Sequence, residues 1–184
     1  MVEHVVLVDK DNTVLGTAPK ATVHTDTTPL HRAFSLFLFN ENNELLLQQR
    51  ALSKKTWPGI WSNSCCGHPQ LGEENADAVS RRVREELGIR IPSEELECML
   101  PDFWYRAELD GIVEHEICPV FVARFSAEPL INPDEVAATR WVSWDTFLDE
   151  IRTQPGRYSE WCEKEAVLLS ESKEFTQWLS QTPR

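Results

Sequence analysis

Two carboxylates stand two residues apart in the segment GIVEHEICPVF, at Glu114 and Glu116. The apolar residues around them predict a β-strand, in which residues two apart project to the same side. Both carboxylates can therefore face one site, and His115 between them is expected on the opposite face. An exposed strand face is the commoner position for such a pair. On a buried strand, they would need a cation or strong hydrogen-bond donors to offset the lost hydration.

Three histidines in separate segments could complete a metal site with this pair. His24 and His31 lie in KATVHTDTTPLHR, where Thr and Pro predict a loop or short turn, and His68 lies in NSCCGHPQLGE. Together with the two glutamates they would offer nitrogen and oxygen ligands, which suit octahedral Mn, Mg or Fe, or zinc. Spacing along the chain does not show that they converge, and a single histidine is more often structural.

The five cysteines, at positions 65, 66, 98, 118 and 162, are expected to be thiols. Their odd number and irregular spacing fit neither a disulfide framework nor a zinc site of paired CxxC motifs. A bridge between the adjacent Cys65 and Cys66 is not expected, because the local geometry would be strained.

The charge balance limits the possible partners. The chain has 18 Lys and Arg against 30 Asp and Glu, a formal net charge of -12. Such a field repels polyanions and argues against binding to nucleic acids or anionic membranes. A small anionic ligand can still bind where basic residues converge. Lys20, Arg50, Lys54 and Arg82 are candidates, although each alone is more simply explained as surface charge.

These residues must be positioned by secondary-structure elements, and the sequence pattern predicts a fold of the α/β class in its α+β form. In this fold, helices pack on a mixed β-sheet. Apolar patterning and turn residues predict two hairpins, in EHVVLVDKDNTVLGTAP and RAFSLFLFNENNELLLQQR, with turns at Asp11–Asn12 and NENN. Further strands are predicted at 102–107, 112–125 and 140–142. Helices are predicted at 74–87, ending before Gly88, and at 143–153 and 159–179, each of these two opening with a serine suited to N-capping. Trp161 opens the last helix, where an aromatic residue ordinarily packs in the core.

Length and composition predict one domain over residues 1–184. The 41% of hydrophobic residues is typical of a packed globular protein. The N-terminal segment MVEHVVLVDKDN has no basic stretch, and no apolar run approaches the ~20 residues of a membrane span. We therefore expect a cytoplasmic protein.

The segment GHPQLGEENADAVSRRVREELGI resembles a Nudix box. The matching positions are Gly67, Glu73, Arg81, Val83, Glu85, Glu86, Gly88 and Ile89. One position departs from the pattern, because Arg82 stands where Nudix hydrolases carry a glutamate that helps to hold the catalytic metal. A cation in place of a metal ligand argues against ordinary Nudix hydrolysis and favours a diphosphate that is bound and left intact.

The rest of the chain resembles a particular family with a Nudix-type fold. The segments HTDTTPLHRAFSLFLFN, RALSKKTWPGIWSNSCCGHPQLGE, PDFWYRA, GIVEHEICPVF and YSEW are together similar to type I isopentenyl-diphosphate isomerases of the bacterial kind. The resemblance covers nearly the whole chain. It implies a small-molecule diphosphate substrate, no nucleic-acid or membrane partner, and a monomer or weak homo-oligomer.

The resemblance also implies a role for each candidate residue. Cys66 and Glu116 match the acid-base pair, whereas Cys65 occupies a position that need not be cysteine. Tyr105 and Trp161 match aromatic residues of the active site. The residues that match a site for one divalent metal, Mn²⁺, Mg²⁺ or Zn²⁺, are His24, His31, His68, Glu114 and Glu116. Glu86 matches the carboxylate that holds Mg²⁺ on the diphosphate. The positions that match diphosphate-binding residues are Lys20, Arg50, Lys54 and Arg82.

The implied reaction moves a double bond between isopentenyl and dimethylallyl diphosphate through a tertiary carbocation, as part of isoprenoid biosynthesis. Two alternatives stay open. The first is a Nudix hydrolase acting on a nucleoside diphosphate derivative, against which Arg82 and the Cys66–Glu116 pair argue. The second is a catalytically silent metal-binding or regulatory module on the same fold, against which the full set of acid, base and ligand residues argues.

Overall fold

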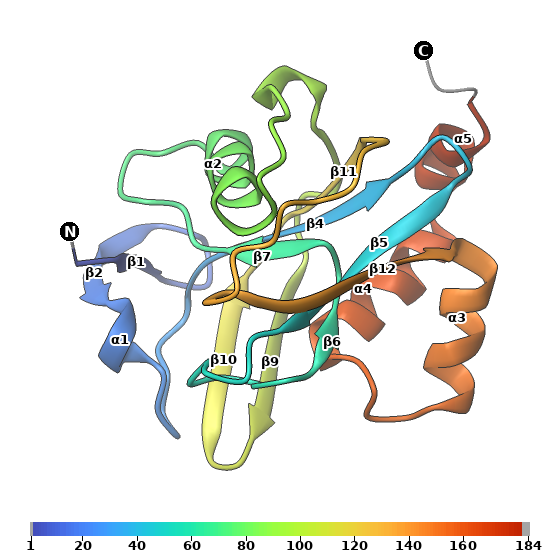
Figure 1. The fold of residues 1–184 in the computed structure, drawn as a ribbon. Helices are drawn as coiled ribbons and strands as arrows, with labels where there is room; N and C mark the ends of the chain where they lie inside the picture. Colours follow the sequence, from blue (N-terminus) through green and yellow to red (C-terminus); the bar gives the residue numbers. More distant parts are fainter. Residues whose placement is uncertain (1, 182–184) are drawn as a thin grey trace.

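The protein contains two β-sheets, seen in a computed structural model that describes residues 2–181 (Figure 1). The first sheet has five strands in the order β2 (Val14–Pro19), β1 (His4–Val8), β3 (His31–Arg32), β10 (Ile112–Ile117) and β9 (Trp104–Leu109). Strands β3 and β10 run parallel and place Glu116 opposite His31. The other neighbours in this sheet are antiparallel.

The second sheet has seven strands. Its main path is β12 (Val136–Ser143), β5 (Glu44–Arg50), β4 (Phe34–Phe39), β11 (Val120–Arg124) and β8 (Glu97–Leu100). Two short strands extend it, β6 (Trp61–Ser62) on β5 and β7 (Cys65–Gly67) on β4. Strand β11 runs parallel to β4, and the remaining pairs are antiparallel.

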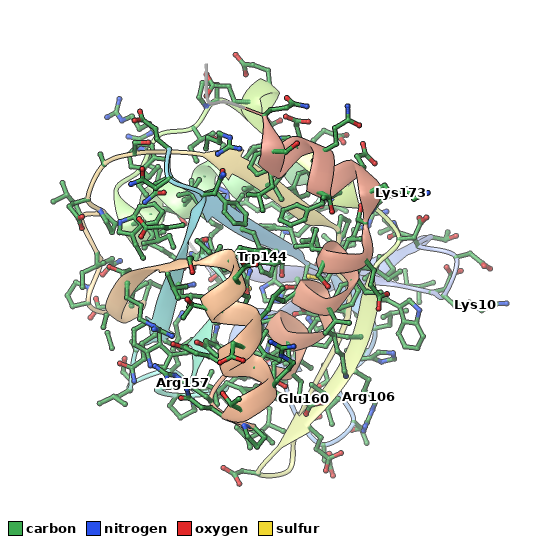
Figure 2. All side chains as sticks on the ribbon, turned by 90° about the vertical axis from the view of Figure 1, so that its right-hand side faces the viewer. Lys10, Arg106, Trp144, Arg157, Glu160 and Lys173 are labelled. Carbon is green, nitrogen blue, oxygen red and sulfur yellow. The ribbon has the colours of Figure 1, made fainter. Side chains whose placement is uncertain are left out.

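Helices cover the second sheet on opposite sides. Figure 1 shows α2 (Asn75–Leu87) on one side, and α3 (Trp144–Thr153), α4 (Glu160–Glu171) and α5 (Lys173–Ser180) on the other. Figure 2 looks onto that second side, where Trp144, Glu160 and Lys173 mark the starts of the three helices. The single-turn helix α1 (Lys20–Val23) and the 3-10 helix η1 (Ser93–Glu95) complete the elements. Within residues 2–181 no helix combines the length and apolarity that a membrane span needs.

Strand β4 explains why the protein has two hydrophobic cores. All six of its side chains are buried, as its Phe- and Leu-rich sequence predicts. Because successive side chains of a strand point to opposite faces, Phe37 and Phe39 join the core beneath α3, α4 and α5, whereas Leu36 and Leu38 join the core beneath α2. The predicted mixed sheet flanked by helices is confirmed.

Both predicted hairpins and the first predicted helix are confirmed. The turn between β1 and β2 holds Asn12 at a φ of 60°, a left-handed conformation that asparagine tolerates well. Helix α2 ends at Gly88, whose φ of 67° and N–H bond to the Arg84 carbonyl form the expected C-terminal cap. Ser143 caps α3 through a hydrogen bond from the Thr146 N–H to its side chain.

Three predictions of local structure were wrong. The strand predicted at 112–125 is two strands in different sheets, β10 and β11, separated at Cys118–Pro119, where proline has no N–H to donate. The helix predicted at 159–179 breaks at Ser172, which is extended (ψ 122°) and caps α5. His31, expected in a loop or short turn, lies in the short strand β3.

Candidate active site

One cavity of about 460 Å³ opens between the two sheets and α1, α2 and α4. All but one of the predicted site residues line it. They are Lys20, His24, Arg50, Lys54, Cys66, His68, Arg82, Glu86, Tyr105, Glu114, Glu116 and Trp161. The exception is His31, which is fully buried and reaches the site through Glu116, with 3.3 Å between its Nε2 and the Glu116 Oε1.

The three histidines and two glutamates converge. We call His24, His31, His68, Glu114 and Glu116 the His/Glu cluster; all five are buried, and one ligand atom from each lies within 4.8 Å of the others. His24 follows α1, His31 lies in β3, His68 follows β7, and both glutamates project from β10. Five positions spread over more than 90 residues are thus brought together by the pairing of β10 with β3 and by the turn after β7.

The donor set of the His/Glu cluster fits a divalent cation. His24 Nε2 and Glu114 Oε2 lie 3.0 Å apart, yet neither atom has a hydrogen-bond partner among the described residues. The His31 Nδ1 lies 2.9 Å from the Pro29 carbonyl, which can only accept a hydrogen bond. The proton of a neutral His31 therefore resides on Nδ1, leaving an Nε2 lone pair that faces Glu116. Buried polar atoms without partners are costly, and a bound cation would satisfy them.

Burial keeps His68 in the form that binds metals. Loss of hydration lowers the pKa of His68 to about 3, outweighing the neighbouring Glu116, whose Oε1 lies 3.0 Å from the His68 Nε2. The imidazole is therefore neutral near pH 7. Neutral imidazole is the ligand form of histidine.

The adjacent cysteines face different environments because successive residues of β7 alternate in direction. Cys65 is fully buried and packs in the core beneath α2. Cys66 lines the cavity, and its thiol donates to Asn63 Oδ1 across 3.0 Å. Burial, helped by the nearby Glu165, raises the pKa of Cys66 to about 12. Cys66 is therefore a protonated thiol at neutral pH, able to act as an acid.

Glu116 is held by partners on both carboxylate oxygens. Its Oε1 faces His31 and His68, and its Oε2 accepts a hydrogen bond of 2.7 Å from the Tyr105 hydroxyl. The Tyr105 ring lies 5.6 Å from the Trp161 ring, and the Trp57 ring lies 5.3 Å from Trp161 on an edge-to-face contact. We call the rings of Trp57, Tyr105 and Trp161 the aromatic wall. Its rings give this side of the cavity an apolar surface, and the Tyr105 hydroxyl fixes the direction of the Glu116 carboxylate.

The four basic residues also line the cavity, and we call Lys20, Arg50, Lys54 and Arg82 the basic cluster. Each already has an oxygen partner. Lys20 pairs with Glu3 at 3.0 Å, Lys54 pairs with Glu135, and Arg82 pairs with Glu85, Glu86 and Glu135. Arg50 donates to the Thr56 carbonyl at 3.0 Å, and its guanidinium carbon lies 5.9 Å from the centre of the Trp161 ring.

The Nudix box is folded around an ion pair. Arg81 donates twice to Glu73, with 2.8 Å for each contact, and so ties α2 to the loop before it. Arg82 points the other way, with only 6% of its surface exposed, and lines the cavity. The residue that departs from the box thus lies inside the site.

The NUDIX domain family matches residues 29–162 of the chain. The relatives by sequence are more specific. An isopentenyl-diphosphate Delta-isomerase of Mycolicibacterium vanbaalenii is 54% identical over 77% of this chain and 78% of its own. Those of Frankia alni and Escherichia coli are 50% and 49% identical, covering 86% and 90% of this chain and 81% and 90% of their own. The chain belongs to the isopentenyl-diphosphate Delta-isomerase family.

Solved structures support the fold. A Deinococcus radiodurans protein superposes with a TM-score of 0.69 at 21% identity, covering 90% of this chain and 98% of its own. A MutT protein from Methanosarcina mazei superposes with a TM-score of 0.61 at 20% identity, covering 83% of this chain and 97% of its own. At such identities the likeness concerns the fold alone, which is the Nudix fold predicted from the box.

Several cavity residues of this family member were not predicted from its sequence. Glu3, Gln48 and Glu135 line the cavity. Glu165 is fully buried, accepts a hydrogen bond from the Cys118 thiol at 3.9 Å, and lies near enough to Cys66 to affect its pKa. Glu165 follows Trp161 by four residues, one helical turn, so the helical pattern could have indicated it. Glu135 stands in a loop, where no periodicity could reveal its direction.

Proposed function

We propose that the protein interconverts isopentenyl diphosphate and dimethylallyl diphosphate, supplying isoprenoid biosynthesis. One observation carries the proposal: a protonated thiol, Cys66, and a carboxylate, Glu116, line the same cavity as a cluster of basic residues. The thiol and carboxylate suit proton transfer to and from carbon, and the basic cluster suits a diphosphate. Relatives about half identical to this chain carry the matching name.

The acid-base pair can move the double bond with balanced protons. An isolated alkene is a very weak base, so a positioned acid must protonate it. Cys66 gives its S–H proton to the terminal alkene carbon, and the positive charge develops on the neighbouring tertiary carbon. Glu116 then takes a proton from the carbon on the diphosphate side, whose electron pair forms the new double bond. The reverse reaction uses the same two groups with their roles exchanged.

The aromatic wall is suited to the carbocation. The face of the Trp161 ring can stabilise a cation by ~2 kcal/mol or more once water is excluded. Tyr105, hydrogen-bonded to Glu116, orients the base. The apolar rings also exclude water, which would otherwise trap the cation as an alcohol.

The basic cluster is proposed to hold the diphosphate, with Mg²⁺ bound through Glu86. Binding the diphosphate away from the reacting carbons supplies energy that fixes their position. It also reconciles the formal charge of -12 with an anionic substrate, because the basic residues are concentrated locally.

The His/Glu cluster is proposed to hold one divalent metal, Mn²⁺, Mg²⁺ or Zn²⁺. When bound, the metal supplies positive charge that offsets the burial of Glu114 and Glu116. The chain's own contribution is to fix the ligands, as the Pro29 carbonyl does for His31.

Hydrolysis of a nucleoside diphosphate derivative is the alternative function. It is disfavoured because Arg82 occupies the position of a metal-binding glutamate in the box and is itself paired with Glu86. A thiol in the cavity also has no part in attack by metal-activated water.

The test is to incubate the purified, metal-loaded protein with isopentenyl diphosphate and Mg²⁺ in deuterated water and to follow the alkene signals by NMR. The expected result is dimethylallyl diphosphate, with deuterium incorporated at carbon. Release of inorganic phosphate without isomerisation would support the hydrolase. Neither product, with metal bound, would contradict the isomerase, and a parallel assay with a nucleoside diphosphate derivative would then distinguish the hydrolase, which releases phosphate, from the silent module, which does not.

A further inference from the structure

Glu135 occupies the space between two residues of the basic cluster. It precedes β12 and lines the cavity, with 24% of its side chain exposed. Its Oε2 accepts a hydrogen bond from Lys54 Nζ and lies 3.3 Å from Arg82 Nη2. The carboxylate therefore occupies the donors that the proposed function assigns to the diphosphate.

A second carboxylate meets the same arginine nitrogen. Glu86 Oε1 contacts Arg82 Nη2, so Glu86 and Glu135 converge on one atom. Gln48 lies beside them, with its Nε2 3.4 Å from Glu86 Oε2. Gln48 is 3% exposed, lines the cavity, and its Oε1 has no hydrogen-bond partner among residues 2–181. Two carboxylates and a buried amide oxygen without a partner form an oxygen-only donor set, which suits a hard divalent cation such as Mg²⁺.

Binding of a diphosphate changes what Glu135 faces. The diphosphate oxygens would accept the hydrogen bonds of Lys54 and Arg82. Glu135 would then lose these partners and lie next to the anion that displaced it. The negative charges of Glu135 and the diphosphate would repel each other, and the partial burial of Glu135 reduces the screening of this repulsion by water. A divalent cation between the carboxylates and the diphosphate would turn this repulsion into attraction.

We propose that Glu135 makes diphosphate binding depend on a divalent cation. Without the cation, Glu135 competes with the diphosphate for Lys54 and Arg82. With the cation, Glu135 and Glu86 hold it against the diphosphate, and Gln48 offers its amide oxygen. This inference rests on the diphosphate site of the proposed function, and it is independent of the acid-base chemistry.

The measurable consequence is a coupling between the two ligands. Mg²⁺ and diphosphate must raise each other's affinity by the same factor, and such factors are typically about 5- to 150-fold. Glu135→Gln keeps the shape of the side chain and removes its charge. It should tighten diphosphate binding without Mg²⁺, weaken it with Mg²⁺, and so reduce the coupling factor at least about fivefold.

The experiment is isothermal titration of inorganic pyrophosphate into the full chain, with and without Mg²⁺. The His/Glu cluster is first loaded with Zn²⁺, so that added Mg²⁺ reports on a different site. Mg²⁺ also binds pyrophosphate in solution, but equally in every sample, so comparing variants isolates the contribution of the protein. Because pyrophosphate has no alkene, a coupling that depends on Glu135 would survive failure of the isomerase proposal.

Three further variants make the result decisive. Asp134→Asn removes an equal charge from the exposed neighbouring position and should leave the coupling unchanged. Glu135→Asp keeps the charge and should retain much of the coupling. This variant still tests the proposal if Glu135→Gln fails to fold. Gln48→Leu should weaken Mg²⁺ binding and leave Mg²⁺-free pyrophosphate affinity unchanged. Equal coupling in wild type and Glu135→Gln, or tighter pyrophosphate binding by Glu135→Gln in both conditions alike, would overturn the proposal.

Discussion

The His/Glu cluster and the basic cluster belong to one site and differ in how their charges are satisfied. In the His/Glu cluster, no side chain is more than 9% exposed, and several ligand atoms lack hydrogen-bond partners among the described residues. In the basic cluster, Lys20 and Lys54 are 25% and 21% exposed, and both already form ion pairs. Under the proposed function, the first would hold a metal that stays bound, and the second would hold a diphosphate that exchanges.

The difference follows from the cost of burial. Unpaired polar atoms in the interior are expensive, so the His/Glu cluster gains most from a permanently bound cation. The ion pairs of Lys20 and Lys54 are partly exposed and therefore weak, so a diphosphate can displace Glu3 and Glu135 from them at modest cost. The Arg82–Glu86 pair is buried and is the exception within the basic cluster. Substitutions in the two clusters should therefore affect different quantities, metal binding and turnover in one case and substrate affinity in the other.

The largest effect is expected from Glu116→Gln. It removes the proposed base and a metal ligand together, so kcat should fall at least about 1,000-fold, within the range for general acid-base groups. Metal content, measured by mass spectrometry after dialysis, should fall as well. Glu160→Gln, at the exposed start of α4, is the control and should match the wild type. A Glu116→Gln enzyme with nearly full kcat would remove Glu116 from the chemistry.

The next effect tests whether the His/Glu cluster binds a metal at all. Removing a residue that only hydrogen-bonds to a metal ligand typically weakens metal affinity by about 10- to 100-fold. Because His24 is proposed to be a ligand itself, His24→Ala should weaken metal affinity by at least that factor. Competition with a fluorescent chelator measures it. His115→Ala is the matched control, because His115 stands between the two glutamates but lies outside the cluster. Equal metal affinity in both variants would contradict the assignment.

A smaller effect is expected in the basic cluster. Arg82→Glu should raise KM by about 10- to 100-fold, since hydrogen bonds to charged groups contribute about 1.5–3 kcal/mol. The effect on kcat should be much smaller. Arg84→Glu makes the same charge change on the exposed face of α2 and should leave KM nearly unchanged. If both variants raise KM equally, the effect comes from the changed net charge of the protein. Direct contact between Arg82 and the substrate would then be contradicted.

The smallest effect concerns the buried Glu165. Burial, with a contribution from the charge of Glu116, raises the pKa of Glu165 well above its usual value. Between the usual pKa of about 4.5 and the raised pKa of the folded protein, the unfolded chain ionises this carboxyl and the folded protein does not. In that window the carboxyl lowers stability by up to about 1.4 kcal/mol per pH unit. Glu165→Gln cannot ionise. Its free energy of unfolding relative to wild type should therefore rise from pH 5 to pH 7, by up to about 2.7 kcal/mol.

Urea unfolding of the metal-free proteins at several pH values measures this difference. The exposed Glu171→Gln, on the same helix, should show no such trend. A difference between Glu165→Gln and wild type that is constant with pH would mean that Glu165 is ionised in the folded protein.

Local patterns predicted most of the elements, and they failed where tertiary contacts or single residues decide the structure. The spacing from Ala76 to Leu87 and the following Gly88 located α2 because both are local signals. The strand break at Pro119 and the helix break at Ser172 were missed, although each residue carries a local reason for it.

The site was predicted chiefly through the family resemblance. Chain spacing alone could not show that His24, His31 and His68 converge, because strand pairing between distant segments brings them together. Neither patterning nor resemblance indicated Glu135. That residues 1–184 form a single domain, and that the protein is a monomer or weak homo-oligomer, stay predictions.

We propose that Cys66 alone of the two adjacent cysteines transfers a proton to the substrate. The most direct measurement compares Cys66→Ala and Cys65→Ala by NMR, with isopentenyl diphosphate in deuterated water and the metal content of both confirmed. We predict that Cys66→Ala forms almost no dimethylallyl diphosphate and that Cys65→Ala retains most of the wild-type rate with deuterium incorporated. An active Cys66→Ala enzyme beside an inactive, folded Cys65→Ala enzyme would assign the proton transfer to Cys65 instead.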